Sequence, residues 1–185
     1  MEEVTRGMAF RIMKSRLEWH PEASRPATGD MLVIPSNDHF WMLAGPGLEL
    51  KKTLGKELEL EAVRQGPVEP GALAVTPGEA AGFRLLVHAA VTGQDHQWVA
   101  GSGVLAMKAC LEQAVRERCA TVVVYPLHRG VHGRPEEPTR EMLEGLLDGL
   151  QAGRGALTVL VLYRDAEEKE LLHRTFLHLL SHAGD

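Results

Sequence analysis

The sequence predicts an α/β domain with three layers, α/β/α, around a mixed, largely parallel central sheet. Two observations predict this class. Short apolar runs alternate along the chain with segments whose apolar residues recur at helical spacing. Several of the runs are also apolar at every position, which is typical of strands buried on both faces of a sheet. The clearest example is residues 121–125, a β-branched run that ends at Pro126.

Six segments are predicted to be strands, and four to be helices. Pro35 and Pro126 are expected to end the strands before them, because proline lacks the backbone donor of a sheet ladder. The apolar stripe Leu50, Leu54, Leu58 and Val63 predicts one helix that ends near Gly66. The predicted strands are residues 8–19, 31–34, 72–76, 83–91, 121–125 and 157–163; the other helices are 103–115, 136–150 and a last one capped by Asp165.

A glycine-containing loop lies between the strand at 121–125 and the helix at 136–150. Strand, glycine loop and helix is the arrangement that directs unpaired backbone N–H groups at an anion. The loop therefore predicts a phosphate site, although Gly-x-x-Gly also occurs in ordinary turns. Its glycines are Gly130 and Gly133, and its cationic or titratable residues are His128, Arg129, His132 and Arg134.

A second glycine loop, residues 43–47, follows the strand predicted at 31–34. In largely parallel sheets, ligands collect at the carboxyl ends of adjacent strands, and both glycine loops follow strands there. Two anion cradles at one edge of a sheet would suit a diphosphate or a nucleotide. Gly47 could equally only flank the turn that contains Pro46.

Composition limits the remaining possibilities. A chain of 185 residues with 44% hydrophobic residues suits one domain, residues 1–185, in which residues 1–30 form an irregular or edge-strand N-terminal extension. The net charge of −5 argues against binding of nucleic acid through its phosphate backbone.

Cys110 and Cys119 are expected to be buried thiols in a reducing compartment. No segment resembles a signal peptide or a membrane span, so a cytoplasmic location is expected.

No cofactor and no metal are expected. A site built from His88, His128 and His132 is possible in principle, but these residues lack metal-ligand spacing. The carboxylates at 57–61 and 165–168 are interpreted as solvated helix faces, and no catalytic residue is assigned.

Four blocks of residues in order give the chain a resemblance to a family. The first is the strand up to Asn37, then Phe40 and Gly45, and the third is Leu86, Val87 and His88 within the strand predicted at 83–91. The fourth is the proline-ended strand and its glycine loop. The chain thus resembles a macro domain, the module that binds ADP-ribose and related nucleotides. The second block is Gly71, Ala72, Thr76 and Gly78, and the fourth contains Val124, Tyr125, Pro126, His128, Arg129, Gly130, Val131, His132, Gly133, Arg134 and Pro135.

The resemblance implies a set of ligand-binding residues. Asn37 would hydrogen-bond the distal ribose of ADP-ribose, or else act as a turn or N-cap asparagine. Gly45 and Gly47 would let the backbone approach the diphosphate. In the loop after residue 126, Arg129 would contact phosphate or remain a solvated arginine, and His132 would contact ribose or be merely exposed. The ligand-binding residues that the resemblance implies are therefore Asn37, Gly45, Gly47, Arg129, Gly130, Val131, His132 and Gly133.

The chain also departs from the pattern of this family. Ile34 stands where the family has its first asparagine, and Pro46 lies where a backbone N–H could otherwise face a phosphate. Leu43 and Ala44 replace two glycines. The aspartate with which the family reads the adenine amino group has no clear counterpart at residues 10–19.

Three functions follow from this comparison. The first is a binding module for ADP-ribose or a related nucleotide diphosphate. The second is a hydrolase that acts on ADP-ribosyl groups or O-acetyl-ADP-ribose, and the third is a macro-fold scaffold that has lost its ligand and associates with proteins. An open cleft lined by both glycine loops would favour binding, whereas a cleft filled by Trp41, Leu43 and Arg129 would favour the scaffold. The oligomeric state is left open.

Overall fold

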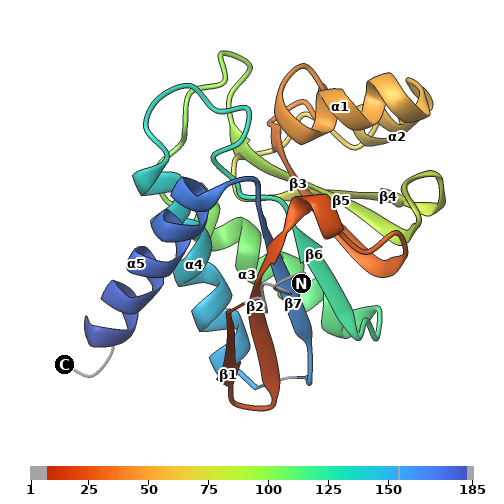
Figure 1. Ribbon diagram of the computed structural model, residues 1–185. Coiled ribbons are helices and arrows are strands. Elements are labelled where there is room, and N and C mark those ends of the chain that lie inside the picture. The colour runs from red at the N-terminus through yellow and green to blue at the C-terminus, as the bar shows by residue number, and fades with distance from the viewer. Residues whose placement is uncertain (1–7, 154, 183–185) are drawn as a thin grey trace, which may run out of the picture.

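A seven-stranded sheet forms the centre of the protein (Figure 1). The computed structural model describes residues 8–153 and 155–182, so the first seven residues of the predicted N-terminal extension lie outside it. The strand order is β1-β2-β7-β6-β3-β5-β4. The five inner strands are parallel, and the edge strands β1 and β4 pair antiparallel with their neighbours. The predicted mixed, largely parallel sheet is therefore confirmed.

The elements follow one another in the predicted alternation. The strands are β1 Ala9–Ile12, β2 Ser15–Pro21, β3 Gly29–Asn37, β4 Leu73–Pro77, β5 Phe83–Thr92, β6 Thr121–Val124 and β7 Thr158–Tyr163. The α-helices are α1 Gly45–Leu54, α2 Glu57–Val63, α3 Ser102–Arg116, α4 Glu136–Gln151 and α5 Ala166–His182. Two short 3-10 turns, η1 Glu22–Ser24 and η2 Glu79–Ala81, follow β2 and β4.

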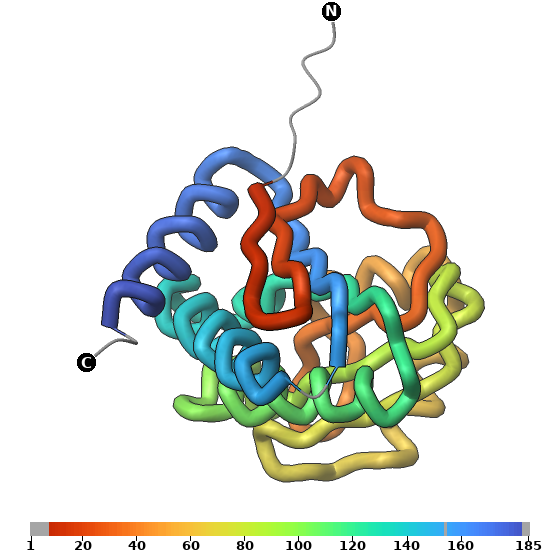
Figure 2. Tube along the Cα trace, turned by 90° about the horizontal axis from the view of Figure 1, so that it is seen from below, coloured from red at the N-terminus to blue at the C-terminus, as the bar shows by residue number. Residues whose placement is uncertain are grey.

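The two faces of the sheet are covered unequally. Alternate strand residues such as Val33 and Val122 pack against α3, α4 and α5, which lie side by side (Figure 2). The opposite face, with Leu32 and Val123, packs against the shorter helices α1 and α2. Because residues alternate between the faces of a strand, uniformly apolar strands supply both layers of core. The three-layer arrangement is as predicted. The layer formed by the short helices α1 and α2 is the thinner one, and it leaves room for a cleft on its face of the sheet.

Strand β3 does not end at Pro35, so that prediction is wrong. The strand continues to Asn37 and pairs with β5 at Pro35 and Ser36. The Val33 carbonyl accepts the N–H of Tyr125 on the β6 side, and residue 35 faces the same side because strand residues alternate. The ladder between β3 and β6 stops at the Val33–Val124 pair, so Pro35 lies just beyond its end and the strand continues through its pairing with β5.

Two further boundaries were predicted wrongly. Residues 8–19 form a hairpin instead of one strand, with Met13 at a φ of 53° in the turn between β1 and β2. The helix predicted through Leu50, Leu54, Leu58 and Val63 is two helices, separated at Gly55, whose φ is 104°. Both breaks are local backbone events, which the spacing of apolar residues does not reveal. Within the described residues, no helix has the length and apolarity to cross a bilayer.

Candidate functional site

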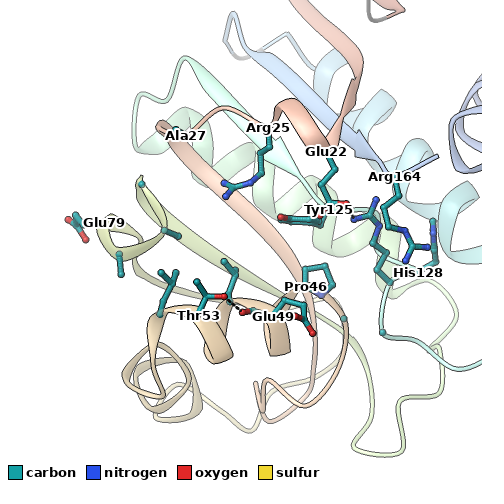
Figure 3. A pocket seen from close by; sticks show the side chains of 18 residues that line it. Glu22, Arg25, Ala27, Pro46, Glu49, Thr53, Glu79, Tyr125, His128 and Arg164 are labelled. Carbon is teal, nitrogen blue, oxygen red and sulfur yellow. Dashed lines mark hydrogen bonds and ion pairs between the residues drawn. The ribbon is translucent and has the colours of Figure 1, made fainter. Parts of the chain in front are cut away.

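A cleft of about 940 Å³ opens on the face of the sheet that α1 and α2 cover, and it extends from the carboxyl ends of the parallel strands, near Gly45 and Gly130, to the amino ends of β3 and β5, near Ala27 and Gly82. One wall comes from η1 and the chain after β6, and the facing wall comes from α1 and η2 (Figure 3). This volume is in the range of small-molecule sites. The cleft is lined by Glu22, Arg25, Ala27, Gly45, Pro46, Glu49, Leu50, Thr53, Leu54, Glu79, Ala80, Ala81, Gly82, Tyr125, His128, Arg129, Gly130 and Arg164.

The two glycine loops touch each other at the end of this cleft. Gly45 and Gly130 have positive φ values of 55° and 87°. A Cβ atom at Gly45 would lie 2.6 Å from the Arg129 carbonyl oxygen, and one at Gly130 would lie 3.0 Å from the Gly45 nitrogen. Only glycine permits so close an approach of two backbones at these φ values. The structure thus brings together Gly45, Arg129 and Gly130, all three of them expected from the sequence.

Beyond this contact lies a second cavity of only about 10 Å³. That volume holds roughly one water molecule. Gly47 and Val131 line this small cavity, not the cleft. The complete lining is Pro35, Ser36, Asn37, Trp41, Met42, Ala44, Gly47, Val91, Thr92, His96, Arg129, Gly130 and Val131.

Asn37 lines the same small cavity, but its amide is used within the protein. Its Oδ1 accepts the N–H groups of His39 at 3.0 Å and Trp41 at 3.1 Å, and its Nδ2 donates to the Trp41 carbonyl at 3.0 Å. The residue is 2% exposed. These contacts match the turn asparagine that the sequence left open as an alternative. Binding of a ribose by this amide stays a prediction.

Arg129 is held by two carboxylates. Its Nε and Nη2 donate to the two oxygens of Glu168 at 3.0 and 2.6 Å, and its Nη1 donates to Glu22 at 2.6 Å. The guanidinium is 6% exposed, and it stacks 5.5 Å from the centre of the Tyr125 ring. This pairing ties the loop after β6 to α5 and to η1. Phosphate would have to compete with two carboxylates for Arg129.

Glu168 is the centre of this network. Burial by itself would raise its pKa, but hydrogen bonds from His128, Arg129 and the Arg164 N–H outweigh burial and hold the pKa at about 2. His128 Nε2 lies 2.9 Å from Glu168 Oε1, and its Nδ1 lies 3.1 Å from Thr139 Oγ1. His128 therefore orients the loop, with both ring nitrogens engaged inside the protein.

His132 and Gly133 lie outside the cleft. The His132 N–H donates to the His96 carbonyl at 2.8 Å, and the two imidazole rings lie 5.7 Å apart. Gly133 has a φ of 112° in open space, beside the start of α4. The loop predicted as one anion cradle is thus divided, because its first half faces the cleft and its second half faces the loop before α3.

Four cleft residues were missed by sequence reasoning. Arg25 has a buried Nη1 atom that has no hydrogen-bond partner among the described residues, and its side chain points into the space between η1 and α1 (Figure 3). Glu22, Tyr125 and Arg164 also line the cleft, and all three lie to one side of Arg25 in this view. Burial raises the pKa of Tyr125, so this phenol stays protonated at neutral pH. The one sequence signal for Glu22 was that a carboxylate follows closely after the strand predicted at residues 8–19.

The described residues contain no group of three or more His, Cys, Asp or Glu side chains that could hold a metal ion. Cys110 and Cys119 are both buried and free. Burial raises the pKa of both thiols, which keeps them protonated and unreactive. Asp30, which follows the glycine at the start of β3, accepts the N–H groups of Ala120 and Thr121 and joins two strands, away from the cleft.

Solved structures share this fold over almost the whole chain. The Oceanobacillus iheyensis macrodomain with MES bound is 18% identical, with a TM-score of 0.78 over 95% of this chain and 97% of that one. The same macrodomain with ADP is 17% identical, with a TM-score of 0.76 over 95% and 97%. The Trypanosoma brucei macrodomain in complex with ADP-ribose is 15% identical, with a TM-score of 0.68 over 89% and 68%.

Sequence comparison agrees with the structural comparison. An uncharacterised protein of Aquifex aeolicus is 31% identical over 118 residues, which are 62% of this chain and 71% of that protein. The family profile described as "Macro domain" matches residues 33–143, more than half of the chain. The resemblance predicted from the sequence is confirmed, and the chain belongs to the macro domain family.

Proposed function

We propose that the protein binds ADP-ribose or a related nucleotide diphosphate in the cleft between α1 and η1. The observation that carries this proposal is the open volume of about 940 Å³, lined by Gly45 of one glycine loop and Gly130 of the other. Leu43 is 54% exposed and Trp41 38% exposed, and neither lines the cleft. Arg129 lines it, but its guanidinium is paired with Glu22 and Glu168.

The two ends of the cleft suit the two ends of a nucleotide. The phosphates would lie near Gly45 and Gly130, whose backbone N–H groups donate to no group in the described part of the chain. Helix α1 begins at Gly45, so its positive end adds to the attraction for an anion. The wider part of the cleft offers a flat guanidinium, Arg25, and the Tyr125 ring to a base and its ribose.

Glu22 is our candidate for the role of the aspartate with which the family reads the adenine amino group, and which has no clear counterpart at residues 10–19. It lies directly after β2, it lines the cleft, and its side chain is 31% exposed. A carboxylate here can accept a hydrogen bond from an exocyclic amino group of a base. The related structures with ADP and with ADP-ribose support this class of ligand, while the identity of the base rests on the proposal alone.

The test is isothermal titration of the purified protein with ADP-ribose, ADP and AMP, together with a variant at the glycine contact. Gly130→Ala places a methyl group 3.0 Å from the Gly45 nitrogen and is expected to weaken binding by about tenfold or more. The matched control is Gly101→Ala, because Gly101 has a similar φ of 83° but a Cβ there meets nothing within 4 Å.

Both alanine variants carry the same backbone strain, so a loss of binding in Gly130→Ala alone locates the ligand at the contact. No heat with any of the three nucleotides would reject the proposal. That result would favour the scaffold alternative, which is supported by the exposed Trp41 and Leu43 on the loop after β3. No residue of the cleft is assigned a catalytic role.

A further inference from the structure

We propose that the protein forms a two-fold symmetric dimer in which strand β1 of one copy pairs with β1 of a second copy. Strand β1 lies at one edge of the sheet and β4 at the other (Figure 1). The interface consists of the outer edge of β1 and the adjacent flank of α5. It does not depend on the ligand proposed for the cleft.

The two edge strands of the sheet differ in how their outer backbone groups are satisfied. At β4, the side chain of Gln65 occupies the edge. Its Nε2 donates to the Val75 carbonyl at 2.9 Å, and its Oε1 accepts the Val75 N–H at 3.1 Å. A side-chain amide that is bonded in this way blocks the pairing of a further strand, so this edge is closed.

The edge of β1 is open. The Trp19 N–H donates to the Met8 carbonyl at 2.9 Å, and backbone groups alternate in direction along an antiparallel strand. Ala9 and Arg11 therefore direct their N–H and carbonyl groups away from β2. None of these outward groups has a hydrogen-bond partner in the described part of the chain. An unpaired edge of this kind is a template for a strand from another molecule.

A two-fold axis at Phe10 uses every one of these outward groups. Two copies of β1 that pair antiparallel about this axis place Ala9 of each copy opposite Arg11 of the other. On the α5 side, Phe10 then faces the same residue of the second copy, and Met8 faces Ile12. These three residues belong to, or pack against, the core beneath α3, α4 and α5. The pairing therefore extends an apolar layer that each copy already has.

The charges on the opposite side of β1 favour the same register. Arg11 pairs with Arg16 of β2, so two like charges face each other within one chain. Arg11 has no carboxylate partner among the described residues, and its Nε donates only to the Met13 carbonyl at 3.4 Å. Glu18 lies beside Ala9 on the neighbouring strand. In the dimer, Arg11 of one copy lies opposite Ala9 of the other, and this short side chain lets the guanidinium reach Glu18 beyond it.

Exposed leucines continue this surface onto α5. Phe10 packs against Phe176 and His173 of that helix, with ring centres 4.5 and 6.1 Å apart. Leu177 and Leu180 follow His173 on the same stripe of the helix, and they are 47% and 42% exposed. A second copy paired at β1 lies next to this stripe. Because β1 has only four residues, the dimer is expected to be weak, with a Kd on the order of 10 µM.

This pairing joins the two sheets into one and places both clefts on the same face of it. Paired residues of neighbouring strands share a face, so the α1–α2 layers of both copies lie on one side. A dimer that binds nucleotides as proposed above can therefore hold two of them on one surface, which raises affinity without new contacts. This consequence rests on the proposed function, whereas the interface does not.

Analytical ultracentrifugation of the unmodified protein tests the interface. Sedimentation equilibrium between about 1 and about 300 µM is expected to show monomer and dimer in exchange. The informative variant is Arg11→Glu. Within one chain it replaces the like charges at Arg11 and Arg16 by an opposite-charge pair, so urea denaturation should show no loss of stability. Across the interface it brings two carboxylates together, so the Kd of the dimer should rise by about tenfold or more.

The matched control is Arg64→Glu, which makes the same change of charge at an exposed residue directly after α2. This variant should dimerise like the unmodified protein. A protein that stays monomeric up to about 300 µM overturns the inference. A dimer that Arg11→Glu and Arg64→Glu weaken equally overturns it as well.

A disulfide locates the axis without relying on affinity. Phe10→Cys places two thiols on the axis, at a pair of strand residues whose Cα atoms lie about 4.5 Å apart, which suits a disulfide. Mild oxidation is expected to join this variant into covalent dimers, because the native Cys110 and Cys119 are buried and do not compete. Lys14→Cys, exposed in the turn after β1, is the control and should join far more slowly. Equal rates for the two variants contradict the pairing about Phe10 and overturn the inference.

Discussion

The two sides of the Gly45–Gly130 contact differ far more in volume than in how their polar groups are satisfied. On the side of the small cavity, Asn37 bonds only to its own loop, and its cavity holds about 10 Å³. On the cleft side, Arg25 has a buried nitrogen without a partner among the described residues, beside about 940 Å³ of open space. Each side thus has one buried side-chain atom without a partner among the described residues, Ser36 Oγ beside the small cavity and Arg25 Nη1 in the cleft, so the volume beside that atom decides whether a ligand can reach it.

The largest effect is expected at Arg129, whose backbone lies at the contact between the two glycine loops. Arg129→Ala removes the guanidinium that pairs with the buried carboxylate of Glu168, and it should lower the free energy of unfolding by about 3 kcal/mol. Urea denaturation at neutral pH measures this change. Arg140→Ala is the matched control, because that arginine is 47% exposed in an i,i+4 pair with Glu144 and should change stability by less than about 0.5 kcal/mol. Equal effects of the two variants would show that the buried ion pair with Glu168 does not stabilise the fold more than an exposed pair does.

The next effect concerns His88 of β5, whose ring packs near Phe40 of the loop that follows β3. Its ring is buried, Phe40 of that loop packs 6.3 Å from it, and burial lowers its pKa to about 4 from 6.5. The unfolded chain binds the proton more tightly, so stability is full above the unfolded pKa and falls as the pH drops from 6.5 toward 4. Between about pH 7 and about pH 5 the loss should be about 2 kcal/mol.

Urea denaturation across this pH range tests the assignment to His88. In His88→Gln the acid-dependent loss should largely disappear, whatever the stability of that variant at neutral pH. His178→Gln, at an exposed position of α5, should keep the loss unchanged. Glu168 does not interfere, because its pKa is lowered to about 2, and its contribution is lost only as the pH falls below its ordinary value of 4.5. An unchanged pH dependence in His88→Gln would contradict the prediction.

The smallest effect on stability is expected on the cleft side. Arg25→Ala removes a guanidinium that contacts the Phe83 ring at 5.4 Å, so the loss of stability should be no more than about 1 kcal/mol. Because this group faces the cleft, affinity for ADP should instead fall by about tenfold. Arg64→Ala, an exposed arginine outside the cleft, is the control in titration calorimetry. Unchanged affinity in Arg25→Ala would remove Arg25 from the binding surface.

Much of the fold could be predicted because its signals are local. The uniformly apolar run at 121–125, with Pro126 after it, predicted the buried strand β6, and the apolar stripe on residues 136–150 predicted α4. Asp165 caps the last helix as expected, by accepting the N–H of Glu168 at 2.9 Å. The extension of β3 past Pro35 could not be predicted, because it depends on where the neighbouring strand β6 ends.

The candidate site could be predicted only in part. Gly45 and Gly130 were expected near a common ligand, and they meet because their strands are neighbours in the sheet. The partner of Arg129 could not be predicted, because Glu168 lies 39 residues away in sequence. Arg25 and Glu22 carry no local motif, so only the position of η1 beside the cleft identifies them.

The sequence by itself determined the alternation of strands and helices, the glycines that follow two of the strands, and the family to which the chain belongs. These properties depend on residue types at short spacing, which apolar periodicity and backbone freedom express directly. The tertiary structure decided that the glycine loops touch, that Arg129 faces two carboxylates, and that a cleft of about 940 Å³ lies on one side of the contact and a cavity of about 10 Å³ on the other. Each of these depends on the distance between residues far apart in the chain, which is set by the packing of the sheet and its helices.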